Sequence, residues 1–238
     1  VNSSDKKGRA LGINGIFGGI GIGSGAFIAG LLIKYFDWKV AFILPGIVSI
    51  FIGIILFIFI INKHISFQNI KSKNLHHSNS SNDLILIASI MLFSMFALGL
   101  TFQIMQTSIP KVFDIRIQNL STFAIGAIIG AIYGIAGLMT LVGGIMADKF
   151  SLKKIYVIGI AAQVPCFFFI AYFTGLPLII VCLIAAMFNS SILPTENILL
   201  AKFTPEKHHG LIYGFKFIIA FGSAPIAVFL ISKIYEQT

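Results

Sequence analysis

The sequence predicts an all-α membrane protein with seven transmembrane helices, and three observations lead to this fold class. First, 57% of the 238 residues are hydrophobic and only 11% are charged, with a mean hydropathy of +0.97. A soluble domain of this size would have too few polar side chains to cover its surface. Second, seven stretches are apolar over the roughly 20 residues that a helix needs to cross a bilayer. Third, the basic residues fall mostly between these stretches.

The seven apolar stretches are expected to be helices, because a segment in lipid must satisfy its own backbone hydrogen bonds. The predicted spans are residues 11–33, 39–62, 84–108, 122–146, 155–174, 177–201 and 210–232. A long polar segment, residues 63–83, separates the first two spans from the other five. It predicts a flexible cytoplasmic linker between a first part, residues 1–62, and a second part, residues 84–238.

The distribution of the basic residues predicts the orientation of the chain. Eleven of the 17 Lys and Arg residues lie on the side of the loop at 144–154, five lie on the other side, and Lys216 lies within a span. Because cytoplasmic loops are enriched in Lys and Arg, the 144–154 loop is expected in the cytoplasm. The net charge of +9 is spread over these short connections, so we expect the lipid bilayer and not nucleic acid as the partner.

Other site classes find little support in the sequence. Cys166 and Cys182 lie inside apolar runs and are expected to be small hydrophobic residues, not a disulfide. The pair His76 and His77 has no third ligand at a suitable spacing, so no metal site is expected. No catalytic or phosphate-binding motif stands out, and we expect neither an enzyme nor a cofactor.

Two charged residues lie well inside predicted spans, where charges are costly and often functional. Glu196 and Lys216 are at similar depth, roughly 9 Å from the cytoplasmic end at 1.5 Å per residue. We expect them to pair as an internal gate or coupling site, which would offset the desolvation of each ion. The alternative is that Lys216 extends to the interface while Glu196 caps a wet helix end.

Polar residues near the middle of the spans are candidates for a substrate pathway. Asn189 precedes Glu196 on nearly the same face of the sixth span, and Tyr133 is central in the fourth span. Gln103 and Gln106 lie toward the outer half of the third span. Each of these four residues alone could equally form a hydrogen bond between helices.

Two ladders of glycines predict close packing between helices. Gly15, Gly19 and Gly23 share one face of the first span, and the fourth span carries a matching ladder. That second ladder consists of Gly126, Gly130 and Gly134. The alternative is that glycine is simply frequent in membrane helices.

A short charged loop carries the resemblance to a known family. The sequence from Gly144 to Lys154 is similar to the Gly-x-x-x-Asp-(Arg/Lys)-x-Gly-(Arg/Lys)-(Arg/Lys) motif of the major facilitator superfamily. Gly144, Asp148, Lys149 and Lys153 fit the motif, whereas Ser151 replaces a Gly. Leu152 also stands where the family prefers a base. These departures resemble the weaker copy of the motif between helices eight and nine.

Two further resemblances lie in the expected order. The segment from Gly25 to Gly30 resembles the Gly-rich fifth helix of the family, with Ala26 where Pro is typical. The segment from Asp37 to Phe42 resembles the Trp-Arg-x-x-Phe turn that opens the sixth helix. The resemblance implies that the chain covers about helices five to eleven of a six-plus-six bundle of twelve, and that the two glycine ladders face one another.

The resemblance also implies a conformational latch. The family's loop Asp contacts the cytoplasmic start of a helix in the other half, which here would be the start of the first span near Arg9. Lys149 and Lys153 would belong to the same latch. An acid at a helix N-terminus is favourable, and this contact would be lost when the halves rock apart. The alternative role for Asp148 is local capping of the helix that follows it.

The expected function is that of a secondary transporter of small solutes, either organic anions or neutral metabolites, by alternating access. A proton-coupled drug exporter of the same superfamily is the alternative. Outside the family, a lysine in the last of seven spans would suit a retinal photoreceptor, but the third span lacks an acid to serve as counter-ion. A channel would differ by flux that does not saturate. We expect a monomer when full length, in a bacterial inner membrane, with protons as a candidate coupling ion.

Overall fold

The computed structural model describes residues 7–62, 81–203 and 209–236, and all seven predicted spans are helices in it. The helices are α1 (Lys7–Tyr35), α2 (Val40–Ile61), α3 (Ser81–Arg116), α4 (Thr122–Lys149), α5 (Leu152–Tyr172), α6 (Gly175–Phe203) and α7 (His209–Glu236). Each is long and apolar enough to cross a membrane. The prediction of an all-α protein with seven transmembrane helices is confirmed.

The third helix differs most from its prediction. α3 ends at Arg116 and not at residue 108, and it continues through Pro110. The predicted end rested on the apolar stretch alone, and a proline within a helix removes one backbone hydrogen bond. Ile109 and Phe113 are buried on either side of it, and this packing sustains the extra turns. α3 also begins at Ser81, so the last residues of the predicted linker are helical, while residues 63–80, with both histidines, lie outside the described part of the chain.

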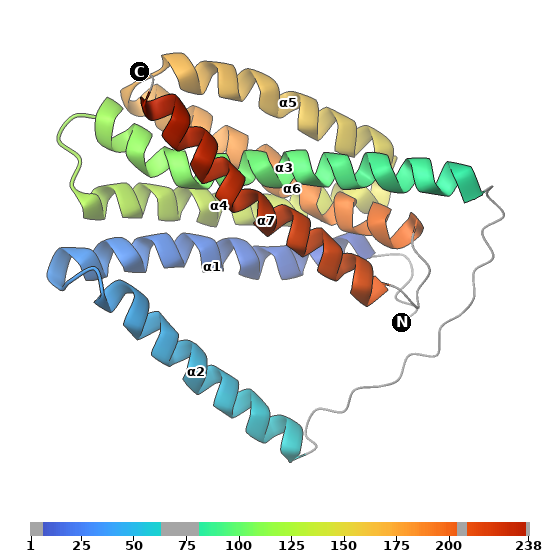
Figure 1. Cartoon of the computed structure of the whole chain (residues 1–238), viewed down its shortest axis with the longest axis horizontal. Coiled ribbons are helices and arrows are strands. Elements are labelled where there is room, and N and C mark those ends of the chain that lie inside the picture. Colours follow the sequence, from blue (N-terminus) through green and yellow to red (C-terminus); the bar gives the residue numbers. More distant parts are fainter. Residues whose placement is uncertain (1–6, 63–80, 204–208, 237–238) are drawn as a thin grey trace.

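α4 makes its contacts mainly with α1, α3, α5 and α6, and it lies beside α1 in Figure 1. α1 and α6 pack directly on α4, α5 packs on α6, and α7 crosses α3. At this crossing a Cβ atom on Gly99 would lie 2.8 Å from the Cα atom of Ala220, so the two backbones nearly touch. α2 diverges from the other helices, and none of its residues is buried (Figure 1).

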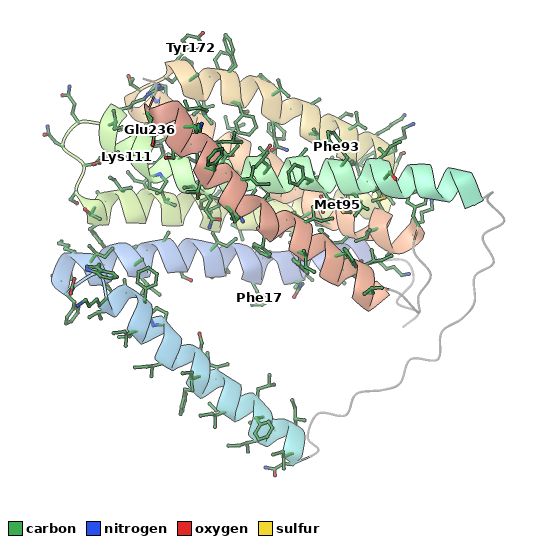
Figure 2. The ribbon with its side chains drawn as sticks, viewed as in Figure 1. Phe17, Phe93, Met95, Lys111, Tyr172 and Glu236 are labelled. Atoms are coloured by element: carbon green, nitrogen blue, oxygen red, sulfur yellow. The ribbon has the colours of Figure 1, made fainter. Side chains whose placement is uncertain are left out.

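The buried core lies among α3, α4, α5 and α6. Phe113, Leu178 and Cys182 are fully covered, and Cys166 is nearly so. Both cysteines are free, as predicted. The outer surfaces are apolar instead of polar: Phe93 is 73% exposed while Met95, two residues later on α3, is 2% exposed (Figure 2). This inverted surface is suited to lipid.

Candidate functional site

α1 and α4 run side by side (Figure 1), and the contact between them is made by the two backbones themselves. A Cβ atom on Gly23 would lie 2.6 Å from the carbonyl oxygen of Gly130, and one on Gly137 would lie 2.7 Å from the Cα atom of Gly19. Real Cβ atoms do not come so close, so these positions need glycine. We call this contact, from Gly8 against Gly144 to Gly30 against Gly126, the glycine seam.

The predicted ladders supply much of the seam, but not all of it. A Cβ atom on Gly126 would meet the carbonyl oxygen of Ala26 at 2.9 Å, whereas one on Gly134 would meet nothing within 4 Å. Gly15 faces the side chain of Thr140. The sequence reasoning missed Thr140, which is buried and whose hydroxyl lies 2.6 Å from the carbonyl oxygen of Gly137 in its own helix and 3.0 Å from that of Gly12 on α1, so its single hydrogen is shared between the two. The sequence did offer one signal for this residue, because Thr140 lies on the same face of the fourth span as the glycines.

At one end of the seam, Asp148 joins the last turn of α4 to the first turn of α1. Its Oδ1 accepts a hydrogen bond from the Gly8 N–H at 2.7 Å, and its Oδ2 accepts one from the Arg9 N–H at 2.9 Å. The N–H groups in the first turn of a helix have no helical partner, and this end carries partial positive charge. Asp148 therefore caps α1. Ser151, at the N-terminus of α5, makes no side-chain capping bond.

The side chains of the other predicted latch residues take no part in the two bonds. Arg9 contributes its backbone N–H and not its guanidinium. Lys149 and Lys153 are exposed. Their roles stay predictions.

Glu196 on α6 and Lys216 on α7 form a buried ion pair. The Lys216 Nζ lies 2.5 Å from Oε1 of Glu196, and the two side chains are 8% and 4% exposed, respectively. The same Nζ donates to Oδ1 of Asn197 at 2.5 Å. Lys216 is thus held inside the protein and does not extend to an interface, and each charge offsets the desolvation of the other.

Two more helices reach this ion pair through hydroxyl groups. The Tyr156 hydroxyl on α5 lies 2.9 Å from the Ser94 hydroxyl on α3, and it is close to the Glu196 carboxylate. We call Ser94, Tyr156, Glu196, Asn197 and Lys216 the polar cluster. It ties α3, α5, α6 and α7 together at one level of the bundle.

An open cleft of about 510 Å³ lies between α1 and α3, with α4 as its floor. Its walls are mostly glycine and aliphatic side chains, and Gln106, Thr122 and Tyr133 are its polar lining residues. No lining residue carries a charge. The lining residues of α4 run from Thr122 to Tyr133, so the cleft lies at the end of the bundle opposite Asp148.

The structure separates the six predicted pathway residues into groups. Gln106 and Tyr133 line the cleft, and Glu196 and Lys216 pair in the polar cluster. Asn189 instead donates a hydrogen bond from Nδ2 to Oε1 of Gln163 at 3.3 Å, which joins α6 to α5. Gln103 is buried on α3 and does not line the cleft.

Comparisons with known proteins agree with this architecture. The family model described as Major Facilitator Superfamily matches residues 2–228. The comparison with curated proteins and the comparison with solved structures each gave no match. The match covers nearly the whole chain, including the Asp148 loop, α1 to α6 and most of α7. The chain therefore belongs to the major facilitator superfamily of secondary membrane transporters.

Proposed function

We propose that the protein moves a small organic solute, an anion or a neutral metabolite, across its membrane by alternating access. In this proposal α1 and α2 belong to one half of the transporter and α3 to α7 to the other, corresponding to about helices five to eleven of twelve. The glycine seam is the contact between the halves. A proton or solute gradient supplies the energy, in a bacterial inner membrane.

The observation that carries the proposal is the double hydrogen bond of Asp148. Both carboxylate oxygens accept from backbone N–H groups of α1, so a single side chain joins the two proposed halves at one end of the seam. Hydrogen bonds to charged groups contribute about 1.5–3 kcal/mol each. A contact of this size biases a two-state equilibrium when only one state forms it. Asp148 thereby favours the state in which this end is closed.

The first test is uptake by the full-length protein in liposomes, over a panel of small anionic and neutral organic solutes. Uptake is expected to saturate and to show counterflow, because an alternating-access site is exposed to one side at a time. Flux that rises linearly with solute concentration would indicate a channel instead. A visible absorption band from a bound chromophore would point to a photoreceptor.

The second test is to compare Asp148→Asn and Asp148→Ala with the matched control Asp114→Asn. Asp114 is an exposed acid at the far end of α3, paired with Lys111 on the surface. The Asp148 variants are expected to change the solute exchange rate about tenfold or more and to speed hydrogen exchange at Gly8 and Arg9. Wild-type exchange in Asp148→Ala would contradict the latch, whereas Asp114→Asn is expected to behave like the wild type.

The Glu196–Lys216 pair is proposed as a gate or coupling site within one half. Its burial and its position among four helices support this role, because the pair links α6 to α7 within the membrane-spanning part of the bundle. If Lys216→Ala and Lys216→Met both left uptake by the full-length transporter unchanged, the pair would have only a structural role.

A proton-coupled drug exporter of the same superfamily is the second candidate. The uncharged, mostly apolar lining of the cleft favours it. Inverted membrane vesicles would separate the two: an exporter would accumulate a hydrophobic dye when acidified inside, and a carrier of small metabolites would not.

A further inference from the structure

We infer that the cleft between α1 and α3 binds an uncharged, largely apolar organic molecule that carries a hydrogen-bonding group. This inference rests on the proposed transport function and narrows its substrate class from anions or neutral metabolites to neutral ones. Four features of the described residues support it: the glycines of the α1 wall, the missing charge, a covered hydroxyl group and the size of the space.

The α1 wall of the cleft contains glycines that helix packing does not need. A Cβ atom on Gly21 or Gly25 would meet nothing within 4 Å, in contrast to Gly19 and Gly23, whose Cβ atoms would collide with α4. In a helix, glycine is about 1 kcal/mol less favourable than alanine. Gly21 and Gly25 relieve no clash with another helix. Their lack of side chains instead leaves the cleft open and exposes a flat strip of backbone.

The charges in the structure leave the cleft neutral. None of its lining residues is ionisable as a base or a carboxylic acid. Lys216, the base inside a span that could have suggested an anionic substrate, is already neutralised by Glu196 at 2.5 Å in the polar cluster. An anion held in this apolar cleft would lack a compensating charge from the lining residues, which is unfavourable. An uncharged molecule incurs no such cost.

A polar group in the cleft wall lacks a partner among the described residues. Tyr133 lines the cleft and is 5% exposed, and its hydroxyl oxygen is covered without a hydrogen-bond partner. An unpaired buried polar group costs about 1–3 kcal/mol. The Phe102 ring packs edge-on against the Tyr133 ring, with centroids 6.1 Å apart, and holds it at the wall. A ligand in the cleft can pair directly with the exposed Gln106 amide, and with the covered Tyr133 hydroxyl only when the ring turns toward the cleft.

The size of the cleft fits this class of ligand. Its volume of about 510 Å³ falls within the roughly 300–1,000 Å³ of small-molecule sites, which are typically apolar with a few placed polar groups. A planar ring could lie on the backbone strip at Gly21 and Gly25, with a polar substituent toward Tyr133.

The test is protection of a single cysteine in the full-length protein. Gly25→Cys is made in a background where the buried native cysteines are replaced, Cys166→Ala and Cys182→Ala, and its reaction with N-ethylmaleimide is timed. Three probes of nearly one shape are added in turn: neutral benzamide, anionic benzoate and cationic benzamidine. Benzamide is expected to slow labelling at least threefold at millimolar concentration, and the two ions less than 1.5-fold.

The matched control is Gly18→Cys in the same background. Gly18 shares the exposed face of α1 and is equally free of contacts, but it does not line the cleft. Benzamide is expected to leave its labelling unchanged. Equal or better protection of Gly25→Cys by benzoate or benzamidine would overturn the inference. So would protection by none of the three probes, as expected if a lipid chain fills the cleft.

A second variant tests the role of the hydroxyl group. Tyr133→Phe removes only an oxygen that has no partner among the described residues, so the unfolding temperature is expected to stay the same or rise. Protection by benzamide is expected to fall at least threefold. A merely structural Tyr133 would give the opposite pattern, a lower unfolding temperature with unchanged protection.

The outcomes separate this inference from the proposed function. If the Asp148 variants change solute exchange but benzamide gives no protection, the transporter stands and the neutral substrate class falls. If benzamide protects but no solute shows saturable transport, the cleft is a binding site and the transport function falls.

Discussion

The glycine seam and the polar cluster join helices in opposite ways. Along the seam, α1 and α4 touch backbone to backbone, and the contacts are non-directional except at Thr140 and Asp148. In the polar cluster, α6 and α7 are bridged by long side chains that carry opposite charges. Lipid tails are as apolar as the helix surfaces, so helices in a membrane associate through close packing and hydrogen bonds. The protein uses each of these means in a different place.

The difference indicates which contact can open. Separating the seam breaks many small dispersion contacts, and lipid or water can replace them. Separating Lys216 from Glu196 would leave two ions in an apolar interior, which is far more costly. The seam, ended by the single latch residue Asp148, is therefore suited to a contact that forms and breaks. The polar cluster is suited to hold α3, α5, α6 and α7 together, and the Glu196–Lys216 pair acts as a gate only where another charge compensates the separated ions.

The largest expected effect comes from removing one charge of the ion pair. Lys216→Met keeps the length and apolar stem of the side chain but leaves Glu196 buried without its cation. Removing one partner of a buried pair typically costs about 3–5 kcal/mol. Unfolding of the detergent-solubilised protein, followed by circular dichroism over increasing SDS, would measure the loss.

The control for this prediction is the double variant Glu196→Gln with Lys216→Met. It removes both charges, so most of the lost stability is expected to return. If Lys216→Met were as stable as the wild type, the ion pair could not be what holds α7 to α6, and the comparison with the seam would fail.

A smaller effect is expected from filling the seam. Gly23→Leu places a side chain where the carbonyl oxygen of Gly130 lies 2.6 Å from the Cβ position, so α1 and α4 must move apart. Overpacking of this kind costs about 1–3 kcal/mol. The same unfolding assay would measure it, with Gly18→Leu as the control.

Gly18 lies on the same helix as Gly23, but its Cβ position has open space within 4 Å. Gly18→Leu is therefore expected to leave the stability of the protein unchanged or slightly raised, since leucine favours helix more than glycine does. Equal losses in the two variants would show that helix propensity, and not the close approach of α1 and α4, sets the need for glycine.

The sequence predicts the spans well because the bilayer imposes length and hydropathy on each helix independently. It places the end of the third span at residue 108, whereas the packing of Ile109 and Phe113 sustains α3 through Pro110 to Arg116. Tertiary contacts of this kind cannot be seen in one stretch of sequence. Glu196 and Lys216 could be identified from the sequence because charged residues are rare within membrane spans.

The rest of the candidate site depends on contacts between helices. Ser94 and Tyr156 are ordinary residues in their own helices, and only the packing brings them to Glu196. Likewise, the sequence cannot distinguish Gly23, which relieves a clash, from Gly25, which opens a cleft two residues later. The outcome depends on which face of α1 meets α4, and that is set by the whole bundle.

The smallest effect is expected from the buried hydroxyl in the seam. Thr140→Val keeps the shape of the side chain but removes the hydroxyl that bonds to Gly12 across the helices and to Gly137 within α4. Hydrogen bonds between helices contribute about 0.6 kcal/mol on average to the stability of membrane proteins, because the polar groups of separated helices find other hydrogen-bond partners. The control is Ser49→Ala on the exposed α2, whose hydroxyl bonds only within its own helix, to the carbonyl oxygen of Pro45.

Thr140→Val is therefore expected to destabilise the protein slightly more than Ser49→Ala, by about 0.5 kcal/mol, and far less than Lys216→Met. A loss above about 2 kcal/mol would mean that a directional bond, and not backbone packing, holds α1 to α4. The seam would then resemble the polar cluster. With one dominant bond near its middle, it would separate in a single step and not progressively from the Asp148 end. Solute exchange measured in the same variant would show whether that bond limits the rate.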